Sequence, residues 1–187
     1  MKKIFCLETE WELSKNKRMR DKASMLPLLN FLEQSKKVEF VFRNVASRTD
    51  LRYYINQLGY KTYKDFQIIY LAFHGSSKAL EIPNDKENPI PFSELAEISN
   101  GFFQDKIIHF GSCRTLYTSD ERILEFKQQT GARLVSGYTK KIDFIRSSIL
   151  DIAYFSELVD IQNIGTIEKR MIKRYDKLMD DLGFKII

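Results

Sequence analysis

The sequence has few cysteines, histidines, glycines and prolines. Two cysteines, Cys6 and Cys113, allow at most one disulfide, and a chain of this size builds a core without one. We therefore expect two reduced thiols in a cytoplasmic protein. The two histidines, His74 and His109, exclude a multi-histidine metal site, and no cysteine–histidine cluster has zinc spacing, so we expect neither a metal nor another cofactor. Eight glycines and four prolines exclude collagen-like and linker-like chains.

Long apolar runs are missing as well. No stretch approaches the roughly 20 residues that a membrane-spanning helix needs, so we expect no membrane partner. The basic start, Lys2-Lys3, is followed by Glu8, Glu10 and Glu12 instead of the apolar core of a signal peptide. With 43% hydrophobic and 29% charged residues, the composition is that of an ordinary globular protein. We expect one domain spanning residues 1–187.

The charge balance is mildly basic, with 30 basic and 25 acidic residues. The basic residues gather in two groups, and acidic residues are interleaved with the second. This pattern favours solvated helix faces, and no nucleic-acid partner is expected. The two groups are Lys15, Lys17, Arg18, Arg20 and Lys22, and Lys169, Arg170, Lys173, Arg174 and Lys177.

Strand-like and helix-like segments alternate along the chain. Strands are predicted at 3–7, 38–45, 66–73, 106–110 and 132–138, with a short hairpin strand at 78–82 and a loop at 74–77. Helices are predicted near 25–32, 49–58, 92–98 and 123–129, the last one ended by Gly131. The C-terminal third is predicted to be helical, with two apolar stripes. This order predicts a three-layer α/β/α sandwich with a mostly parallel sheet. The stripes are Ile145, Ile149, Ile152, Phe155 and Leu158, and Ile167, Met171, Tyr175, Leu178 and Leu182.

Two of the predicted strands end in chemically capable residues. The strand at 66–73 is followed by His74 and Gly75, and the strand at 106–110 by Gly111-Ser112-Cys113. Ligands bind at the carboxyl ends of parallel strands, and neighbouring strands lie about 4.8 Å apart. If these two strands are neighbours, His74 lies beside Cys113 and can act as the base that a thiol nucleophile needs.

The second histidine is in the wrong place for that role. His109 lies four residues before Cys113 within a strand, roughly 13 Å away at about 3.3 Å per residue. We expect it to be a buried, hydrogen-bonded structural residue. Glycine at position 75 permits a close approach of the backbone, and its N–H, together with that of Cys113, can donate to an oxyanion.

These motifs resemble those of caspase-like cysteine peptidases, and most closely those of CHAT domains. The resemblance consists of His-Gly after one apolar strand, Ser112-Cys113-Arg114-Thr115 after the next, and a Gly-Ala-Arg-x-Val strand at 131–135. It covers residues 66–160. It implies a caspase-like fold and a cysteine endopeptidase in which Cys113 is the nucleophile and His74 the general acid–base. The oxyanion and substrate-pocket residues that go with it are Gly75, Ser76, Ser112, Tyr138 and Asp143.

The resemblance also implies a protein or peptide substrate and a regulatory protein partner, since CHAT domains usually stand beside other modules. Many relatives that cleave after arginine or lysine carry an acidic residue two positions before the cysteine. Gly111 occupies that position here, so basic specificity is not indicated by it. Asp143 remains open as a negative pocket floor or as a helix cap, and Tyr138, where the family often has tryptophan, as a pocket wall.

Two alternative functions without peptidase chemistry remain open for this chain. A catalytically inactive caspase-like module would keep the fold and bind a regulatory partner with its strand-end surface. A flavodoxin-like regulator or nucleotide binder would need a phosphate loop or an acidic phosphoacceptor. The chain has no Gly-x-Gly-x-x-Gly and no Walker sequence, although Glu8 and Glu10 follow the first strand. Selective labelling of Cys113 over Cys6 would separate the enzyme from both.

Overall fold

A central sheet organises the chain. The computed structural model describes residues 2–11, 23–36, 38–83, 85 and 89–187. Its six-stranded sheet has the order β2-β1-β3-β7-β8-β9. Neighbouring strands are parallel except for β8 and β9, which are antiparallel. The strands are β1 (Lys3–Glu8), β2 (Glu39–Asn44), β3 (Ile68–Ala72), β7 (Ile107–Phe110), β8 (Leu134–Tyr138) and β9 (Phe184–Ile186).

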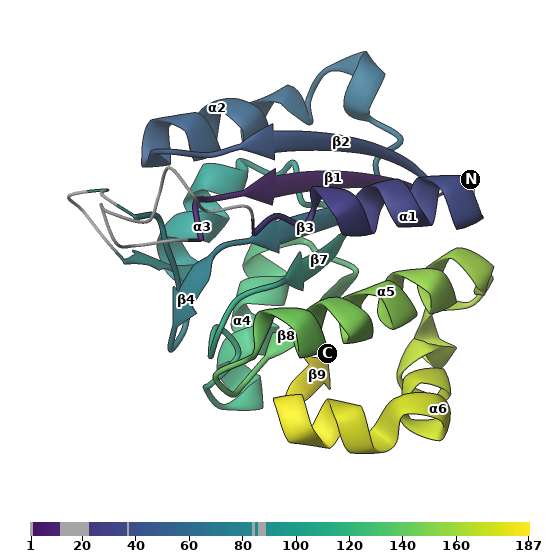
Figure 1. Ribbon diagram of the computed structural model, residues 1–187. Helices are drawn as coiled ribbons and strands as arrows, with labels where there is room; N and C mark the ends of the chain where they lie inside the picture. Colours follow the sequence, from purple (N-terminus) through teal and green to yellow (C-terminus); the bar gives the residue numbers. More distant parts are fainter. Residues whose placement is uncertain (1, 12–22, 37, 84, 86–88) are drawn as a thin grey trace.

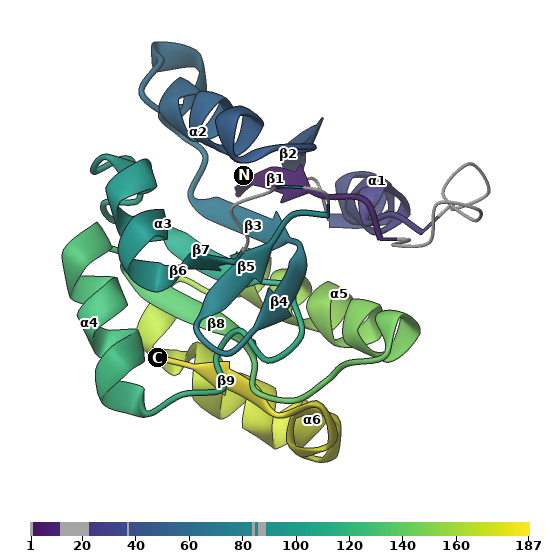
Figure 2. The same cartoon turned by 90° about the vertical axis from the view of Figure 1, so that its left-hand side faces the viewer.

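Helices cover both faces of this sheet, as Figures 1 and 2 show. In Figure 2, α2, α3 and α4 lie on one side of the sheet, and α1, α5 and α6 on the other. The predicted three-layer α/β/α architecture with a mostly parallel sheet is therefore confirmed. The helices are α1 (Leu26–Lys36), α2 (Arg48–Gln57), α3 (Phe92–Ser99), α4 (Asp120–Thr130), α5 (Phe144–Asp160) and α6 (Ile167–Leu182), with short 3₁₀ turns η2 (Lys61–Tyr63) and η3 (Ile164–Thr166).

The continuous apolar strands explain the two-sided packing, because successive side chains of a strand point to opposite faces. Phe5 and Leu7 of β1 pack into the core under α2, α3 and α4. Ile4 and Cys6 of the same strand pack into the core under α1, α5 and α6. Gly131 ends α4 as predicted, with a left-handed φ of 66°.

A second, smaller sheet corrects the prediction of a loop after β3. It has the order β4-β5-β6 and is antiparallel. The strand that begins at His74 pairs with the predicted hairpin strand, so its backbone groups bond in a ladder instead of in a loop. The strands are β4 (His74–Ser76), β5 (Ala79–Glu81) and β6 (Ile90–Pro91).

The predicted apolar stripe of α5 is wrong at its beginning. Ile145 and Ile149 are 67% and 54% exposed. The buried face of α5 includes Ser147 and Asp151 instead, because both find polar partners inside the protein, which a count of apolar residues overlooks. The C-terminal third is not wholly helical either, since it ends in β9.

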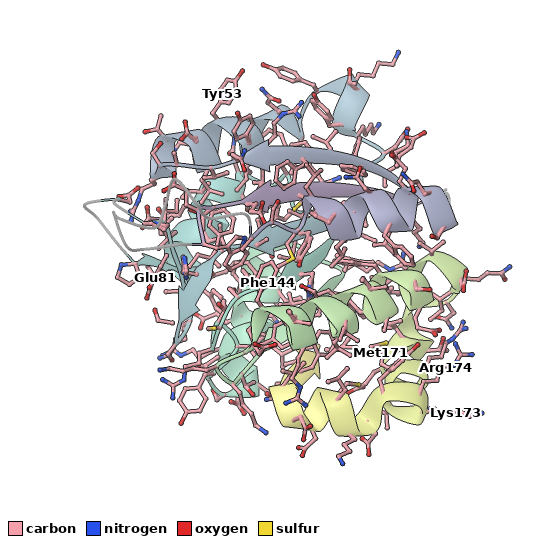
Figure 3. The ribbon with its side chains drawn as sticks, in the orientation of Figure 1. Tyr53, Glu81, Phe144, Met171, Lys173 and Arg174 are labelled. Atoms are coloured by element: carbon pink, nitrogen blue, oxygen red, sulfur yellow. The ribbon has the colours of Figure 1, made fainter. Side chains whose placement is uncertain are left out.

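The second basic group lies on α6 and largely forms the predicted solvated face. Figure 3 shows Lys173 and Arg174 at the outer side of α6. Arg170 and Arg174 bind the carboxylate of the buried Glu157 of α5, which joins the two helices. All five residues of the first basic group lie within 12–22, outside the described residues. Within the described part of the chain, no helix is long and apolar enough to cross a membrane.

Candidate active site

The two predicted catalytic residues follow adjacent strands. β3 pairs in parallel with β7, and Leu71 stands opposite Phe110 near the carboxyl ends of both. The Gly111 N–H donates to the Leu71 carbonyl at 3.0 Å, which extends the pairing one step beyond β7. The predicted adjacency of the two strands is confirmed. His74 and Cys113 therefore leave the sheet at the same edge, where parallel sheets bind their ligands.

His74 and Cys113 line one cavity of about 180 Å³. Most of its wall is apolar or aromatic, and it draws on segments that are far apart in the sequence. Its walls come from the segment after β1, the start of α1, the ends of β3 and β7, and the start of α5. The other lining residues are Trp11, Met25, Phe73, Gly111, Ile142, Phe144 and Ser147.

The imidazole of His74 is held by a backbone carbonyl. Its Nε2 lies 3.0 Å from the carbonyl oxygen of Glu10. A carbonyl can only accept, so Nε2 carries the hydrogen and donates it. The neutral ring then has its lone pair on Nδ1, which hydrogen-bonds to no described residue. Trp11 packs against the ring in a T-shaped arrangement with 5.5 Å between the centroids. His74 is therefore oriented as a base whose free nitrogen is Nδ1.

The thiol of Cys113 is half-buried and rests against the chain that leads into α5. Its Sγ accepts a hydrogen bond from the Ile142 N–H at 3.5 Å and lies 3.9 Å from the Ile142 carbonyl oxygen. Within the described part of the chain, no hydrogen bond joins this thiol to the imidazole. Catalytic hydrogen bonds are often long before substrate binds, so two side chains that share a cavity without such a bond are compatible with a catalytic pair.

A tight turn presents the thiol. Arg114, directly after Cys113, has a φ of 57°, a left-handed conformation that is uncommon for a residue with a side chain. Its N–H donates to the Lys140 carbonyl at 3.0 Å. Inside the turn, the hydroxyls of Ser112 and Thr115 are 2.6 Å apart. The turn is thus fixed both to the chain after β8 and within itself.

Gly75 lies against this turn. A Cβ atom at position 75 would come within 2.3 Å of the Thr115 hydroxyl and 2.6 Å of the Cys113 carbonyl oxygen. The close approach that glycine permits is thus to the turn that carries Cys113. The Cys113 N–H donates to no described residue. The backbone of Gly75 therefore lies directly against the turn that carries Cys113.

None of the predicted oxyanion and pocket residues, Gly75 included, is among the described lining residues of the cavity. Ser76 pairs with Ala79 in the small sheet. Ser112 and Tyr138 are fully buried, which rules out the predicted contact with substrate in this conformation. Asp143 is exposed and caps α5, accepting from the Arg146 N–H at 2.9 Å. Tyr138 points to the face of the sheet under α5, and Asp143 takes up the helix-cap role that the sequence left open.

Glu8 is a functional candidate that the sequence did not single out for this site. It is 3% exposed, and its carboxylate accepts from Trp11 Nε1 at 2.8 Å, Ser24 Oγ at 2.7 Å and the Met25 N–H at 2.6 Å. Two of those donors belong to residues of the cavity wall. The hydrogen bonds of Glu8 therefore hold Trp11 and Met25 in position in the cavity wall. An acidic residue at the end of a buried strand is the only signal that the sequence carried.

His109 is confirmed as a buried structural histidine. Its ring nitrogens lie 3.0 Å from Ser136 Oγ and 2.9 Å from Asp151 Oδ1. Asp151, 1% exposed, also accepts from the hydroxyls of Tyr70 and Tyr138. Burial first, and then the charge of Asp151, raises the pKa of both tyrosines well above the usual value. Tyr70 and Tyr138 belong to the core under α1, α5 and α6, so this network is part of the protein interior.

Known proteins place the chain in a family and in a fold. The chain belongs to a family of unknown function, DUF6642, whose model matches residues 1–187. No curated protein matches it. Matches among solved structures comprise 47 chains. One is a secreted C11 cysteine protease from Bacteroides thetaiotaomicron, determined in complex with an irreversible peptide inhibitor, with a TM-score of 0.58 and 8% sequence identity.

That match covers 96% of this chain and 59% of the protease, so the chain spans somewhat more than half of the protease's length. At this identity the likeness concerns the fold alone. The fold is thus caspase-like, as the resemblance in the sequence implied. The comparisons do not extend to the CHAT group.

Proposed function

We propose that this member of the DUF6642 family is a cysteine peptidase that hydrolyses a peptide bond in a protein substrate. Cys113 is the nucleophile and His74 the general acid–base. One observation carries the proposal: the only thiol and the only imidazole at the carboxyl edge of the described sheet line the same cavity. The bond from His74 Nε2 to the Glu10 carbonyl adds to it, because it leaves Nδ1 to accept the thiol proton.

The first half of the reaction forms an acyl-enzyme. Nδ1 of His74 takes the proton of the Cys113 thiol, and the thiolate attacks the carbonyl carbon of the scissile peptide. The N–H groups of Gly75 and Cys113 stabilise the negative oxygen of the tetrahedral intermediate. The imidazolium then gives its proton to the leaving nitrogen, the C–N bond breaks, and the acyl group remains on sulfur as a thioester.

The second half returns the enzyme to its starting state. Water enters in place of the released amine and loses a proton to Nδ1 as it attacks the thioester. The C–S bond breaks, the acid leaves, and the thiolate takes the proton back from the imidazolium. No cofactor is needed for either half. Because the nucleophile must stay reduced and both cysteines are free thiols, the proposal includes a reducing, cytoplasmic setting and control by a regulatory protein partner.

Cleavage of a mixed peptide library, followed by mass spectrometry, tests the proposal. Cys113→Ala and His74→Ala are each expected to lower the cleavage rate by about 10³-fold or more, because the members of a dyad act as a unit. Tyr53→Ala is the matched control, because Tyr53 is an exposed residue of α2, labelled in Figure 3, that does not line the cavity. Cleavage by Cys113→Ala at the parent rate would exclude the mechanism.

The inactive caspase-like module is the second candidate. The observation in its favour is that the hydrogen-bonding neighbours of Cys113 Sγ are backbone groups of Ile142 and not the imidazole. A folded parent protein that cleaves no peptide of the library, and whose Cys113 reacts no faster than a free thiol, would favour this module over the peptidase.

A further inference from the structure

The described wall of the cavity beside Cys113 carries no acidic or basic side chain apart from the imidazole of His74. Among its described lining residues, His74 and Cys113 are the only groups that titrate, and none is an aspartate, glutamate, lysine or arginine. Trp11, Met25, Phe73, Ile142 and Phe144 make up most of the wall. A charged substrate side chain in this space would lose its hydration and gain no partner of opposite charge among the described lining residues.

Three carboxylates near the cavity are already bound to other groups. Glu8 lies behind Trp11 and Met25 with its carboxylate bound to the three donors described above. Asp143 is used as the cap of α5. Asp151 is bound to His109 and two tyrosines in the core. None of the three carboxylates is among the groups that line the cavity.

Position 111 is closed to a side chain. A Cβ atom there would come within 2.6 Å of the Tyr70 ring and 3.0 Å of its hydroxyl. Tyr70 cannot give way easily, because it is fully buried and its hydroxyl donates to Asp151 at 2.6 Å. The wall two residues before Cys113 is therefore the backbone of Gly111, and the buried Tyr70 ring behind it leaves no room for an acidic side chain.

The size of the cavity suits a medium-sized apolar group. An engineered cavity of about 150 Å³ lined by aliphatic and aromatic side chains binds benzene, and the volume here is about 180 Å³. The rings of Trp11 and Phe144 meet edge to face, with 5.5 Å between centroids, and form one side of the space. Figure 3 labels Phe144 at the beginning of α5, next to this edge of the sheet.

We propose that this cavity is the specificity pocket and takes an uncharged, apolar side chain of the residue whose carbonyl Cys113 attacks. Leucine, methionine and phenylalanine fit its volume and its wall. The inference rests on the proposed peptidase function and adds its substrate class. Trp11 contacts both the imidazole of His74 and the ring of Phe144, so a side chain in the pocket touches the same wall that holds the base.

Acyloxymethyl ketone dipeptides that differ only in the last residue test this specificity. Cys113 Sγ displaces the carboxylate of such a probe and forms a thioether with the methylene carbon. We expect leucine and phenylalanine probes to label Cys113 about 10- to 100-fold faster than lysine, arginine or aspartate probes, the range that one pocket contact can discriminate. A fastest rate with lysine, arginine or aspartate would overturn the inference.

A small reagent separates this result from a failure of the proposed function. Iodoacetamide needs no specificity pocket, so its rate with Cys113 and the loss of that rate in His74→Ala report on the dyad alone. A reactive, His74-dependent Cys113 with equal rates for all probes would overturn the specificity and leave the dyad standing. An inert Cys113 in the folded protein would overturn both.

A wall variant adds a test with a matched control. Phe144→Ala removes one side of the pocket and is expected to raise the rate of a naphthylalanine probe, relative to the leucine probe, by about 10-fold. Ile145→Ala changes the next residue of α5, which is 67% exposed and does not line the cavity, and should leave that ratio unchanged. A shift of equal size in both variants, or in neither, would contradict the assignment of the pocket.

Discussion

Two regions of the molecule each hold one cysteine and one histidine. Cys6 and His109 lie in a single row across the sheet, where Cys6 stands beside Tyr70, Tyr70 beside His109 and His109 beside Ser136. His74 and Cys113 lie at the end of the same strands and line a cavity. The residue types are the same, so the differences between the two regions come from their positions.

Both ring nitrogens of the histidine in the interior row have hydrogen-bond partners, whereas the histidine at the strand end has a described partner for only one. Burial, followed by the charges of Glu8 and Asp151, raises the pKa of the Cys6 thiol well above its usual value. Both ring nitrogens of His109 have partners, while His74 has one at Nε2. A histidine or cysteine is available for chemistry here only where the fold leaves a nitrogen or sulfur facing open space.

Thiol labelling should give the largest contrast between the two regions. Iodoacetamide should react with Cys113 in the native protein at least about 10³-fold faster than with Cys6, which needs an opening of the core to be reached. Mass spectrometry of labelled peptides over time measures both rates. In guanidinium chloride the two thiols should react alike. Equal rates in the native protein would remove the distinction.

Asp151, which accepts hydrogen bonds from the interior row, should contribute strongly to the unfolding free energy of the protein. Asp151→Ala leaves the donors of Tyr70, Tyr138 and His109 buried without their acceptor, and we expect a loss of about 3–5 kcal/mol in unfolding free energy. Urea titration measures it. Asp143→Ala on the same helix removes only an exposed cap and should cost about 1 kcal/mol. Similar losses for the two variants would argue against the network.

Exchanging the two histidines for alanine should separate stability from reactivity. His109→Ala leaves a cavity and breaks two buried hydrogen bonds, so we expect a loss of about 3 kcal/mol in unfolding free energy. The rate at which Cys113 reacts in the molecules that stay folded should hardly change. His74→Ala should show the reverse pattern. Urea titration and thiol labelling of both variants check this, and a drop in Cys113 reactivity with His109→Ala would connect the two regions.

Alkaline pH should lower the free energy of unfolding, because the buried tyrosines and Cys6 are stable in the core only in their neutral forms. Burial raises the pKa values of Tyr70, Tyr138 and Tyr154 above 10.0, and that of Cys6 above 9.0. These groups ionise earlier in the unfolded chain, so the stability that their neutral forms contribute is present in full below about pH 9. It falls as the pH rises further, by up to about 1.4 kcal/mol per pH unit for each group. Denaturation between pH 7 and 11 measures the slope, and Tyr154→Phe should lessen it.

Local patterns were sufficient to predict the strands, the end of α4 and the two strand ends that carry His74 and Cys113. These features depend on the spacing of apolar residues and on a glycine that can adopt a left-handed conformation. Both can be read from residues that are close together in the sequence. The exposed face of α5 was predicted wrongly because Ser147 and Asp151 are buried by partners that lie elsewhere in the chain. The pocket walls were missed for a similar reason, since Trp11, Met25 and Phe144 come from three separate segments.

By itself the sequence determined a layered α/β fold and which histidine stands beyond the end of a strand, because a buried strand must be apolar on both faces and can carry exposed polar groups only past its end. Only the tertiary structure decided that Tyr138 and Ser112 face inward, that Asp143 serves as a helix cap and that the cavity beside Cys113 is apolar. A cavity forms between segments that meet only after folding, so its shape and charge depend on side chains that no local pattern brings together.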